Sequence, residues 1–383
     1  MTLDELTYFQ SEPGSRLLNE AREVEGHSLR KQDVLRRDFP GDRVRAALTL
    51  LDLRERAKTK FAEADRMFFD RDGLEQASGD VVANHRARRY SGYDSVADFC
   101  CGVGGDTAAL ACVANVCAVD IRQERVGMTR ANLSARGLTA RFLVANVGHL
   151  CPNFDAVFVD PSRREGGRRV VHLSDYAPPV DDRSWLGNVT GVGIKVAPGI
   201  DHGEVPADAE VEFISVGGEC REAVLWFGAL RTDAEVRATV LPTGESLVQT
   251  SFESVPCGAV DKYLYEPDRA VIRAHLVEQV ARDIGADKLA EDVAYLTAGS
   301  HVESPFVKGY LVEEVMDFSI RRVRNYVTSN RIGRLEIKKR RFPMQPDEIR
   351  GKLKLKGSGS ATLVLTRVDR GPIAVFCQPI RPH

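Results

Sequence analysis

Hydrophobic and polar positions change their spacing twice along the chain. Up to about residue 90, apolar residues recur three and four positions apart among charged ones, as in ALTLLDLRERAKTKF (47–61), which is typical of amphipathic helices. From Tyr93, short apolar runs alternate with helical patterns, as in a parallel, doubly wound sheet. The pattern predicts a helical region (1–90), an α/β domain (91–258) and an α+β domain (262–383).

Short apolar runs of the middle region are its predicted strands, and helical patterns separate the first three of them. This order indicates a Rossmann-like sheet. The runs at 223–230 and 239–243 are expected to form an antiparallel edge. The other predicted strands are SVADFC (95–100), VCAVD (116–120), ARFLVAN (140–146), FDAVFVD (154–160), VTGVGIKV (189–196) and VEFISV (211–216).

The last region is expected to open with one long helix, YLYEPDRAVIRAHLVEQVARDIG (263–285). Pro267 would lie in its first turn, where proline is tolerated. A strand is predicted at 306–318, followed by a helix that Ser319 caps. Two closing strands are expected to form a hairpin around residues 369–371.

Composition limits the class and location of the protein. The chain of 383 residues is long enough for two or three domains, and its net charge is only −2. It has no run of about 18 apolar residues, and MTLDELTYFQ lacks the features of a signal peptide, so we expect a cytoplasmic protein without a membrane span. None of the eight cysteines forms a CxxC pair. We interpret them as reduced core residues and expect no metal site.

The segment DFCCGVGGDT (98–107) lies between a predicted strand and a predicted helix, and its glycines allow the backbone to approach a ligand closely. Asp120, 18 residues after Gly102, ends the next predicted strand, where nucleotide-binding sheets place an acid for ribose hydroxyls. A P-loop is excluded because no GxxxxGK[ST] occurs, and the dinucleotide fingerprint fails at Thr107. A purely structural turn and an S-adenosylmethionine site, which also has acids after its first two strands, stay open.

The residues around this loop carry a family resemblance. VADFCCGVGGDTAALA (96–111) resembles motif I of class I S-adenosylmethionine-dependent methyltransferases, and is most similar to the FCGVGG form of the trimethylguanosine synthase group. FDRDGLEQASGDVVANHRARRY (69–90) resembles the segment before motif I in that group, which contributes to the cofactor pocket. The layout of residues 60–383 resembles bacterial methyltransferases with a C-terminal THUMP-like domain, also in KYLYEPDRAVIR (262–273) and GRLEIKKR (333–340).

The resemblance implies S-adenosyl-L-methionine as the cofactor. After the third strand the family often has an acid for the adenine amino group, whereas this chain has Asn146 and Val147. The Asn146 side chain and the Val147 backbone are alternative acceptors, and an ordinary loop asparagine is a third interpretation. We interpret both loop cysteines as small packing residues. The expected cofactor-binding residues are Gln76, Ser78, Asp98, Cys100, Cys101, Gly102, Gly104, Gly105, Asp106, Asp120, Ile121, Ala145, Asn146, Val147 and Asp160.

FDAVFVDPSRREGGRR places residues 160–164 just after the fourth predicted strand, at the edge where open α/β sheets bind ligands. The resemblance implies a site like the (Asp/Asn)-Pro-Pro-aromatic motif of amino-group methyltransferases. There, a carboxylate and a proline carbonyl hold the amino hydrogens, and catalysis is mostly positioning. This chain departs from the motif at Ser162 and Arg163; an arginine can stack on a base or bind a phosphate, or do neither. The expected catalytic residues are Asp160, Pro161, Ser162 and Arg163, with loop capping as the structural alternative for Asp160.

Two other polar groups lie near predicted strand ends. Lys195 ends the strand of GIKVAPGI, where contact with phosphate or substrate and ordinary solvation are both open. Glu219, Arg221 and Glu222 lie between two apolar strands, and we interpret them as an ion pair that stabilises the sheet edge.

The stretch from Arg321 to Lys356 is strongly basic. It holds 13 basic and three acidic residues, a net charge of +10, so the rest of the chain carries −12. A basic module on an acidic body indicates a polyanion partner, with solvated charge as the structural alternative. The cluster of Arg86, Arg88 and Arg89 can extend this surface. The residues expected to contact RNA phosphates are Arg334, Lys338, Lys339, Arg340, Arg341, Lys352, Lys354 and Lys356.

Three functions follow from these observations. The first is a methyltransferase that transfers a methyl group from S-adenosylmethionine to a base nitrogen of RNA, either tRNA or another structured RNA. The second is a catalytically weakened relative that only binds RNA, which the altered DPSRR motif favours. The third is a methyltransferase acting on a protein or small molecule, against which the basic stretch argues. We expect the first, with RNA as partner and neither membrane nor metal.

Overall fold

The computed structural model describes residues 1–150, 153–162, 164–165, 168–169 and 172–380. The chain divides into two compact units, Met1–Val211 with Glu222–Glu235, and Glu212–Arg221 with Val236–His383. The N-terminal helices and the parallel strands between residues 95 and 196 belong to the first unit. The three-part division expected from the sequence stays a prediction.

The first ninety residues are helical, as the spacing of apolar residues predicted. Leu50 and Phe61 from this region belong to one buried core with Val103 of the glycine loop and Met128 of helix α8 (Gln123–Ala135), so the helices are anchored next to the loop. The α-helices are α1 (Leu3–Gln10), α2 (Glu12–Glu23), α3 (Ser28–Leu35), α4 (Gly41–Ala57), α5 (Arg71–Gln76) and α6 (Asp80–Ala87).

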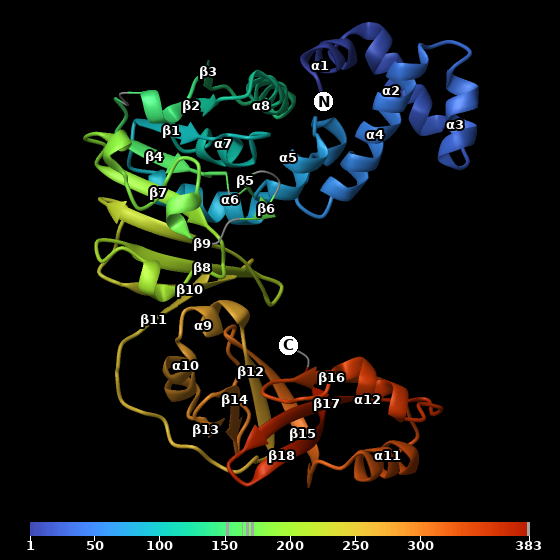
Figure 1. The fold of residues 1–383 in the computed structure, drawn as a ribbon, viewed down its shortest axis with the longest axis vertical. Helices are drawn as coiled ribbons and strands as arrows, with labels where there is room; N and C mark the ends of the chain where they lie inside the picture. The colour runs from blue at the N-terminus through green and yellow to red at the C-terminus, as the bar shows by residue number, and fades with distance from the viewer. Residues whose placement is uncertain (151–152, 163, 166–167, 170–171, 381–383) are drawn as a thin grey trace. The chain divides into compact units, whose positions relative to one another are not determined.

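Parallel strands form the centre of the first unit (Figure 1). In the order β9-β7-β4-β1-β2-β3, only β9 runs antiparallel to its neighbour, which confirms the Rossmann-like sheet. Helix α7 (Gly105–Leu110) contacts β1 and β2, and α8 contacts β2 and β3. The strands of this region are β1 (Ser95–Phe99), β2 (Asn115–Asp120), β3 (Arg141–Val144), β4 (Ala156–Val159), β7 (Gly191–Val196), β8 (Glu210–Val216) and β9 (Glu219–Gly228); β5 (Arg164–Glu165) pairs with β6 (Arg168–Arg169). Residues 212–221, which include most of β8 and the start of β9, belong to the second unit.

The second unit contains a seven-stranded sheet in the order β13-β14-β12-β15-β18-β17-β16. Strands β16 and β17 are parallel, and β17 and β18 form the predicted closing hairpin. Its strands and helices are β12 (Tyr263–Pro267), α9 (Arg269–Arg273), α10 (Val277–Ile284), β13 (Asp287–Ala290), β14 (Val293–Ala298), β15 (Val307–Asp317), α11 (Ile320–Ser329), β16 (Ile332–Lys339), α12 (Pro346–Lys352), β17 (Gly359–Val368) and β18 (Gly371–Pro379), with the antiparallel pair β10 (Val236–Leu241) and β11 (Glu245–Val248).

The one long helix expected at 263–285 is wrong: the segment forms a strand followed by two separate helices, α9 and α10. Residues 263–267 form strand β12, which pairs with β14 and β15, because aromatic and apolar side chains favour strands. Pro267 is therefore the last residue of a strand, not the first turn of a helix. The Asp268 side chain then accepts a hydrogen bond from the Ala270 amide (2.7 Å) and starts α9. Ser319 precedes α11 as expected, but its side chain makes no capping hydrogen bond.

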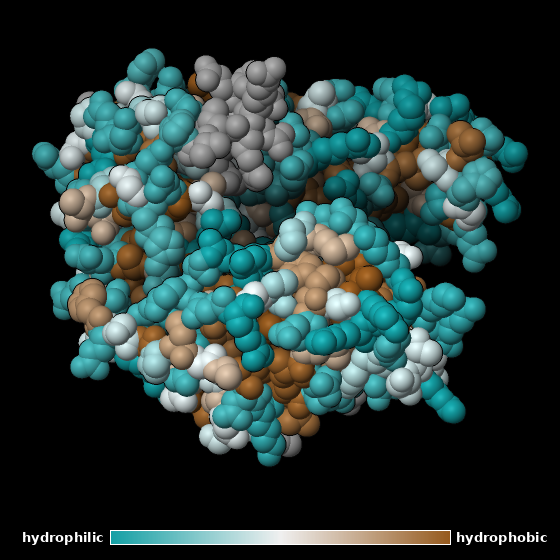
Figure 2. All heavy atoms as spheres, turned by 60° about the horizontal axis from the view of Figure 1, so that its bottom comes forward, coloured by the Kyte–Doolittle hydropathy of each residue, from teal (hydrophilic) through white to brown (hydrophobic). Residues whose placement is uncertain are grey.

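The length of the helices and the polarity of the surface bear on where the protein can lie relative to a membrane. No helix in the described part of the chain is long and apolar enough to cross a membrane. The face drawn in Figure 2 is mostly hydrophilic, with smaller apolar areas between the polar side chains.

Candidate active site

The glycine loop joins β1 to α7 through backbone conformations that favour glycine. Gly102 and Gly104 have φ angles of 61° and 84°, and Cys100 adopts 63°. Gly104 precedes α7, and a Cβ at its neighbour Gly105 would lie 2.8 Å from the Ser78 carbonyl oxygen. The glycines therefore allow the loop to turn tightly and to pack against the segment that precedes it in the sequence.

Asp120 holds the loop from the end of the neighbouring strand. Its Oδ2 accepts a hydrogen bond from the Gly102 amide (3.1 Å), and its Oδ1 accepts one from the Arg122 amide (2.9 Å). Burial raises the pKa of Asp120, and these two backbone donors offset part of the effect. The carboxylate expected to bind ribose is thus fixed beside the glycine loop, and each oxygen keeps further acceptor capacity.

Asp98 is fully buried on β1. Its Oδ2 accepts a hydrogen bond from the Thr107 hydroxyl (2.5 Å), whereas its buried Oδ1 has no partner among the described residues. Burial raises the pKa of Asp98 well above its usual range, and the nearby Asp106 carboxylate adds to this effect. A buried acceptor without a donor is unfavourable in an apoprotein, and is expected where a ligand supplies the donor.

The segment before motif I is fixed to the same loop. The Asn132 side chain accepts a hydrogen bond from the Phe68 amide (2.7 Å) and donates to the Val103 carbonyl (2.8 Å). Asp70 pairs with Arg125 (3.0 Å). Helix α5 and the following residues, which include the expected site residues Gln76 and Ser78, are therefore fixed against α8 and the loop.

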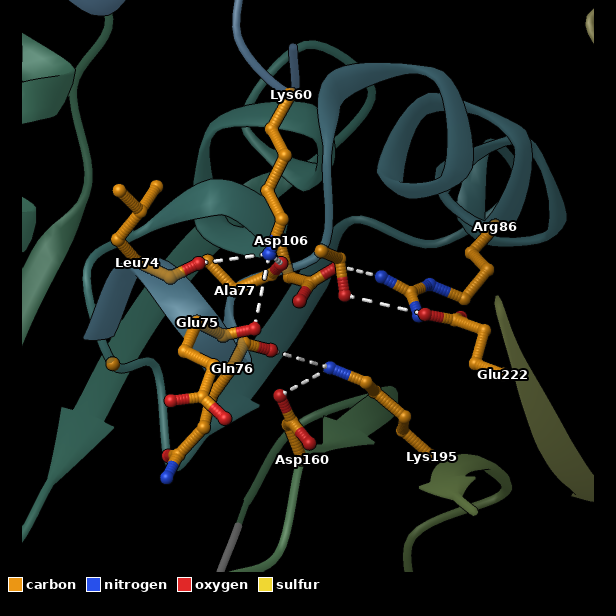
Figure 3. A network of polar contacts seen from close by, with 12 residues as sticks. Lys60, Leu74, Glu75, Gln76, Ala77, Arg86, Asp106, Asp160, Lys195 and Glu222 are labelled. Carbon is orange, nitrogen blue, oxygen red and sulfur yellow. Dashed lines mark hydrogen bonds and ion pairs between the residues drawn. The ribbon is translucent and has the colours of Figure 1, made fainter. Parts of the chain in front are cut away.

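Arg86 lies in the interior, with 2% of its surface exposed, between two carboxylates. Figure 3 shows it paired with Asp106 on α7 and Glu222 on β9. Ser78 lies beside the same group, and its hydroxyl donates to Glu222 (3.4 Å). Asp106 and Ser78, expected to bind the cofactor, thus direct their side chains into an internal charge network.

The basic cluster around Arg86 is therefore not the surface track that the sequence indicated. Arg89 also pairs internally, with Glu210 (2.8 Å), and of the three arginines only Arg88 is exposed. Because the run lies on a helical turn, its side chains point in different directions, which a count of charges does not reveal.

Asp160 and Lys195 meet at the ends of the adjacent strands β4 and β7. The Lys195 ammonium donates to Asp160 Oδ2 (2.7 Å) and to the Gln76 carbonyl (3.2 Å), and only 4% of Lys195 is exposed (Figure 3). The interpretation of Lys195 as an ordinary solvated lysine is therefore wrong. Lys195 thus fixes one carboxylate oxygen of Asp160, and the other, Oδ1, has no partner among the described residues.

The rest of the DPSRR motif is described in part. Pro161 is buried, and Ser162 is exposed and exchanges two backbone hydrogen bonds with Ala177 (2.9 and 3.0 Å). Arg163 lies outside the described residues. The motif thus follows β4 directly, with Asp160 at the sheet edge, as expected.

The remaining expected cofactor residues follow β2 and β3 at the same edge. Ile121 is 65% exposed, which is unusual for a large apolar side chain next to a buried strand. Ala145 donates its amide to the Asp120 carbonyl (3.0 Å), and Val147 is buried. The Asn146 side-chain oxygen accepts a hydrogen bond from the Gly148 amide (3.0 Å).

The cysteines of the loop are packing residues in this environment. Cys101 is 7% exposed, and its sulfur lies 3.6 Å from the Thr129 hydroxyl. Burial raises the pKa of both the Cys100 and Cys101 thiols, which opposes thiolate formation. In the described part of the chain, no group of three metal-binding side chains comes together.

The predicted RNA-binding residues lie in the second unit and divide into two groups. Lys338 and Arg340 pair with Glu266 (2.8 and 3.5 Å), and the exposed Arg341 pairs with Asp292, so carboxylates of the protein neutralise part of this charge. The members without an ion pair among the described residues are Arg334, Lys339, Lys352, Lys354 and Lys356. Arg334 also lines a hollow of about 620 Å³ together with Glu336, Arg350 and Thr362.

The sequence did not predict the internal ion pairs that Arg86 and Lys195 form. Arg86 was assigned to a surface cluster, and the pairing of Lys195 with Asp160 was not anticipated. A signal for the second was present, because β4 and β7 were expected to end at the same edge. No comparable signal existed for Glu222, which was grouped with Glu219 and Arg221 as an ion pair of the sheet edge; Glu219 pairs instead with Arg269 (2.5 Å).

Family models match three stretches of the chain. They are a methyltransferase domain at residues 96–162, a THUMP domain-like family at 307–379 and a domain of unknown function at 2–57. The first covers the glycine loop, Asp120 and Asp160, and the second covers the basic stretch.

Full-length comparisons agree with these matches. An uncharacterized S-adenosylmethionine-dependent methyltransferase of Mycobacterium tuberculosis (strain H37Rv) is 35% identical over 359 residues, 89% of this chain and 99% of the relative, and the protein of strain CDC 1551 matches equally. A crystal structure of a protein from Porphyromonas gingivalis W83, assigned to the methyltransferases, has the same fold (TM-score 0.77, 22% identity, 96% of this chain and 98% of that chain). The chain therefore belongs to the S-adenosylmethionine-dependent methyltransferases, with a class I sheet and a C-terminal THUMP-like region.

Proposed function

We propose that this methyltransferase modifies RNA, and that it transfers the methyl group to a base nitrogen of tRNA or another structured RNA. The observation that carries the proposal is the position of Asp160. Its carboxylate lies at the sheet edge after β4, with one oxygen fixed by Lys195 and the other free of partners among the described residues. Such a group can hold an amino hydrogen of the acceptor in a fixed direction.

The residues around the loop fit S-adenosylmethionine, which supplies an electrophilic methyl group on its sulfonium. The buried Asp98 Oδ1 has no donor in the described part of the chain, and a cationic ligand that carries N–H groups would provide one. Asp120 has acceptor capacity left for ribose hydroxyls. Ile121, which is 65% exposed, offers an apolar surface for adenine, with Asn146 and Val147 close in sequence to the end of β3 for its amino group.

Transfer to an amino nitrogen requires little acid–base chemistry from the protein. Asp160 Oδ1 and the Pro161 carbonyl would hold the amino hydrogens, so that the nitrogen lone pair faces the methyl group. The proton can leave to solvent after transfer. The exposed Ser162 stands where related motifs have a second proline, so the acceptor base is held without that ring.

The charge of the second unit supports RNA as the acceptor. The basic members without an ion pair, Arg334, Lys352, Lys354 and Lys356, are all exposed, and Lys339 is half-buried. Exposed lysines and arginines contact phosphates and position a nucleic acid without selecting its sequence. The match of residues 307–379 to a THUMP-like family is consistent with this assignment.

Methyl transfer from tritiated S-adenosylmethionine to RNA tests the proposal. The RNA is purified from source cells whose gene for this protein has been deleted, so that the target is unmethylated. We expect label in RNA with wild type and none with Asp160→Ala, while Asp233→Asn, an exposed acid of the same unit, keeps full transfer. Label that persists in Asp160→Ala would contradict the role of this carboxylate.

Two other outcomes identify the alternative functions. Cofactor binding with RNA binding but no label in any RNA pool would support a catalytically weakened RNA-binding protein, which the Ser162 and Arg163 departures favour. Label that enters protein or small molecules of the same extract, but not RNA, would support the third function.

A further inference from the structure

The carbonyl end of helix α5 is bound by two lysines (Figure 3). The Lys60 ammonium donates to the carbonyls of residues 74, 75 and 77 at 2.8, 3.0 and 2.9 Å. The Lys195 ammonium donates to the remaining one, that of Gln76, at 3.2 Å. Four successive carbonyls at the negative end of this helix are thus satisfied by two cations.

Lys195 differs from Lys60 because it also binds Asp160. A lysine with 4% exposure is tolerated only when its charge is paired and its donors are used. Here the two partners come from different parts of the site. Gln76 belongs to the segment that packs beside the glycine loop, and Asp160 belongs to the loop after β4.

Among the described residues, Asp160 has other carboxylates near it as well as the cations Lys195 and Arg86. Asp160 lies close enough to the carboxylates of Asp98 and Glu222 to raise the pKa of both, although burial is the larger cause in each case. A carboxylate among like charges would turn toward solvent if the cation that binds it were removed. The ammonium therefore determines where Asp160 points.

We propose that Lys195 is a positioning residue that holds Asp160 and the end of α5 with one ammonium, so that the acceptor-binding carboxylate keeps a fixed place relative to the cofactor-flanking segment. The inference rests on the proposed function for the role of Asp160. It assigns no covalent step to Lys195, which acts through Asp160 and through the Gln76 carbonyl.

Affinity for S-adenosylhomocysteine, measured by calorimetry, tests this coupling without knowledge of the acceptor. The single variants are Lys195→Met, Asp160→Ala and the matched control Lys60→Met, which also frees carbonyls of α5 but does not touch Asp160. The double variants combine Asp160→Ala with each lysine change. Melting curves confirm that each variant is folded.

We expect Lys195→Met and Asp160→Ala each to weaken binding by about tenfold, because each leaves the other charge poorly paired. Their double variant should bind within about twofold of the weaker single variant, since both changes break the same contact. The fold losses of affinity caused by Lys60→Met and by Asp160→Ala should instead multiply in their double variant, because the two changes remove different contacts. Lys195→Arg, which keeps a cation, should bind more tightly than Lys195→Met.

If the affinity losses of Lys195→Met and Asp160→Ala multiply in the double variant, the two residues are not coupled and the inference is wrong. It is also wrong if Lys195→Arg binds S-adenosylhomocysteine no more tightly than Lys195→Met. These results leave the proposed function intact if wild type binds S-adenosylhomocysteine and methylates RNA. Wild type that does not bind S-adenosylhomocysteine would remove the cofactor role of the site, and the inference about Lys195 with it. If wild type binds S-adenosylhomocysteine but does not methylate RNA, only RNA as the proposed acceptor is wrong. The affinities of the single and double variants still test whether Lys195 and Asp160 are coupled.

Discussion

Several carboxyl groups are buried near the edge of the sheet that we assign to the cofactor, and their burial changes how they titrate. Asp98, Asp120 and Glu222 each have a pKa raised chiefly by burial. A carboxyl whose folded pKa lies above its unfolded value takes up a proton on folding, so stability falls as pH rises from about 4 toward the folded pKa. These buried carboxyl groups therefore lower the free energy of unfolding, and this loss grows as pH rises toward their folded pKa values.

Asp98→Asn tests this cost, since the amide oxygen can still accept from Thr107. The variant removes the proton uptake on folding, so its stability advantage over wild type should increase with pH, by at most about 1.4 kcal/mol per pH unit above pH 4. Urea unfolding at pH 5 and pH 7.5 measures it. The exposed Asp233→Asn serves as control, and a pH-independent difference between Asp98→Asn and wild type would contradict the account.

The sequence predicted the acids of this edge better than it predicted their cations. Asp98, Asp120 and Asp160 each follow or end an apolar run, which marks a strand end without knowledge of the fold. Lys195 also ends such a run, but its partner Gln76 is 119 positions away in the sequence. Contacts over such separations depend on packing that local patterns do not encode.

Elements around the glycine loop fit together with little free space. Asn132 of α8 donates a hydrogen bond to the glycine loop, and Asp70, just before α5, pairs with a residue of α8. Gly105 of the loop lies against the Ser78 carbonyl. The tight contact explains why the segment before motif I lies beside the loop, as the resemblance implied.

Gly105→Ala tests this packing. Its Cβ would lie 2.8 Å from the Ser78 carbonyl oxygen and 3.3 Å from the Phe61 ring, so the segment at Ser78 must move. We expect a loss of about 1–3 kcal/mol in unfolding free energy and weaker binding of S-adenosylhomocysteine. Thermal unfolding and calorimetry measure the two effects. Gly92→Ala, where a Cβ meets nothing within 4 Å, should change neither, and equal effects of both variants would contradict the packing argument.

Element boundaries were predictable where the pattern was strongly periodic. The parallel strands and α8 lie where the sequence placed them, because buried strands are short uniform apolar runs. The segment 263–285 was misassigned because a strand of only five residues comes just before a stretch of helical composition that begins at residue 269. The short strand was therefore read as the start of the helix. Strands β13 and β14 were not anticipated at all.

Charge is distributed unevenly over the whole molecule. The stretch from Arg321 to Lys356 carries +10 in a chain whose net charge is −2. Ion pairs with Glu266 and Asp292 neutralise part of it, so the effective basic surface is smaller than the sequence indicated. Counting charges predicted the sign of this region but not which residues face solvent.

A test of RNA binding by the basic stretch uses three of its exposed lysines, Lys352, Lys354 and Lys356. Replacing all three with alanine should weaken RNA binding at every sequence and reduce the slope of log K against log salt by roughly 2, because each lysine that neutralises a phosphate contributes about 0.7–0.9. Filter binding between 50 and 200 mM salt measures the slope. The triple alanine variant of Arg30, Arg36 and Arg37, which are exposed on the N-terminal helices, should leave it unchanged. An unchanged slope for the lysine variant would contradict RNA binding by this surface.

The measurement that tests the account most directly is calorimetric titration of S-adenosylhomocysteine into wild type and Asp120→Ala. Asp120 fixes the Gly102 amide and is placed to accept from ribose, so its loss should cost about 1.5–3 kcal/mol, roughly ten- to a hundredfold in affinity. Asp94→Ala, an exposed acid just before β1, should bind as wild type does. Binding that weakens only in Asp120→Ala is the predicted result. Wild type that fails to bind, or Asp120→Ala that binds equally well, would contradict the assignment of this edge to the cofactor.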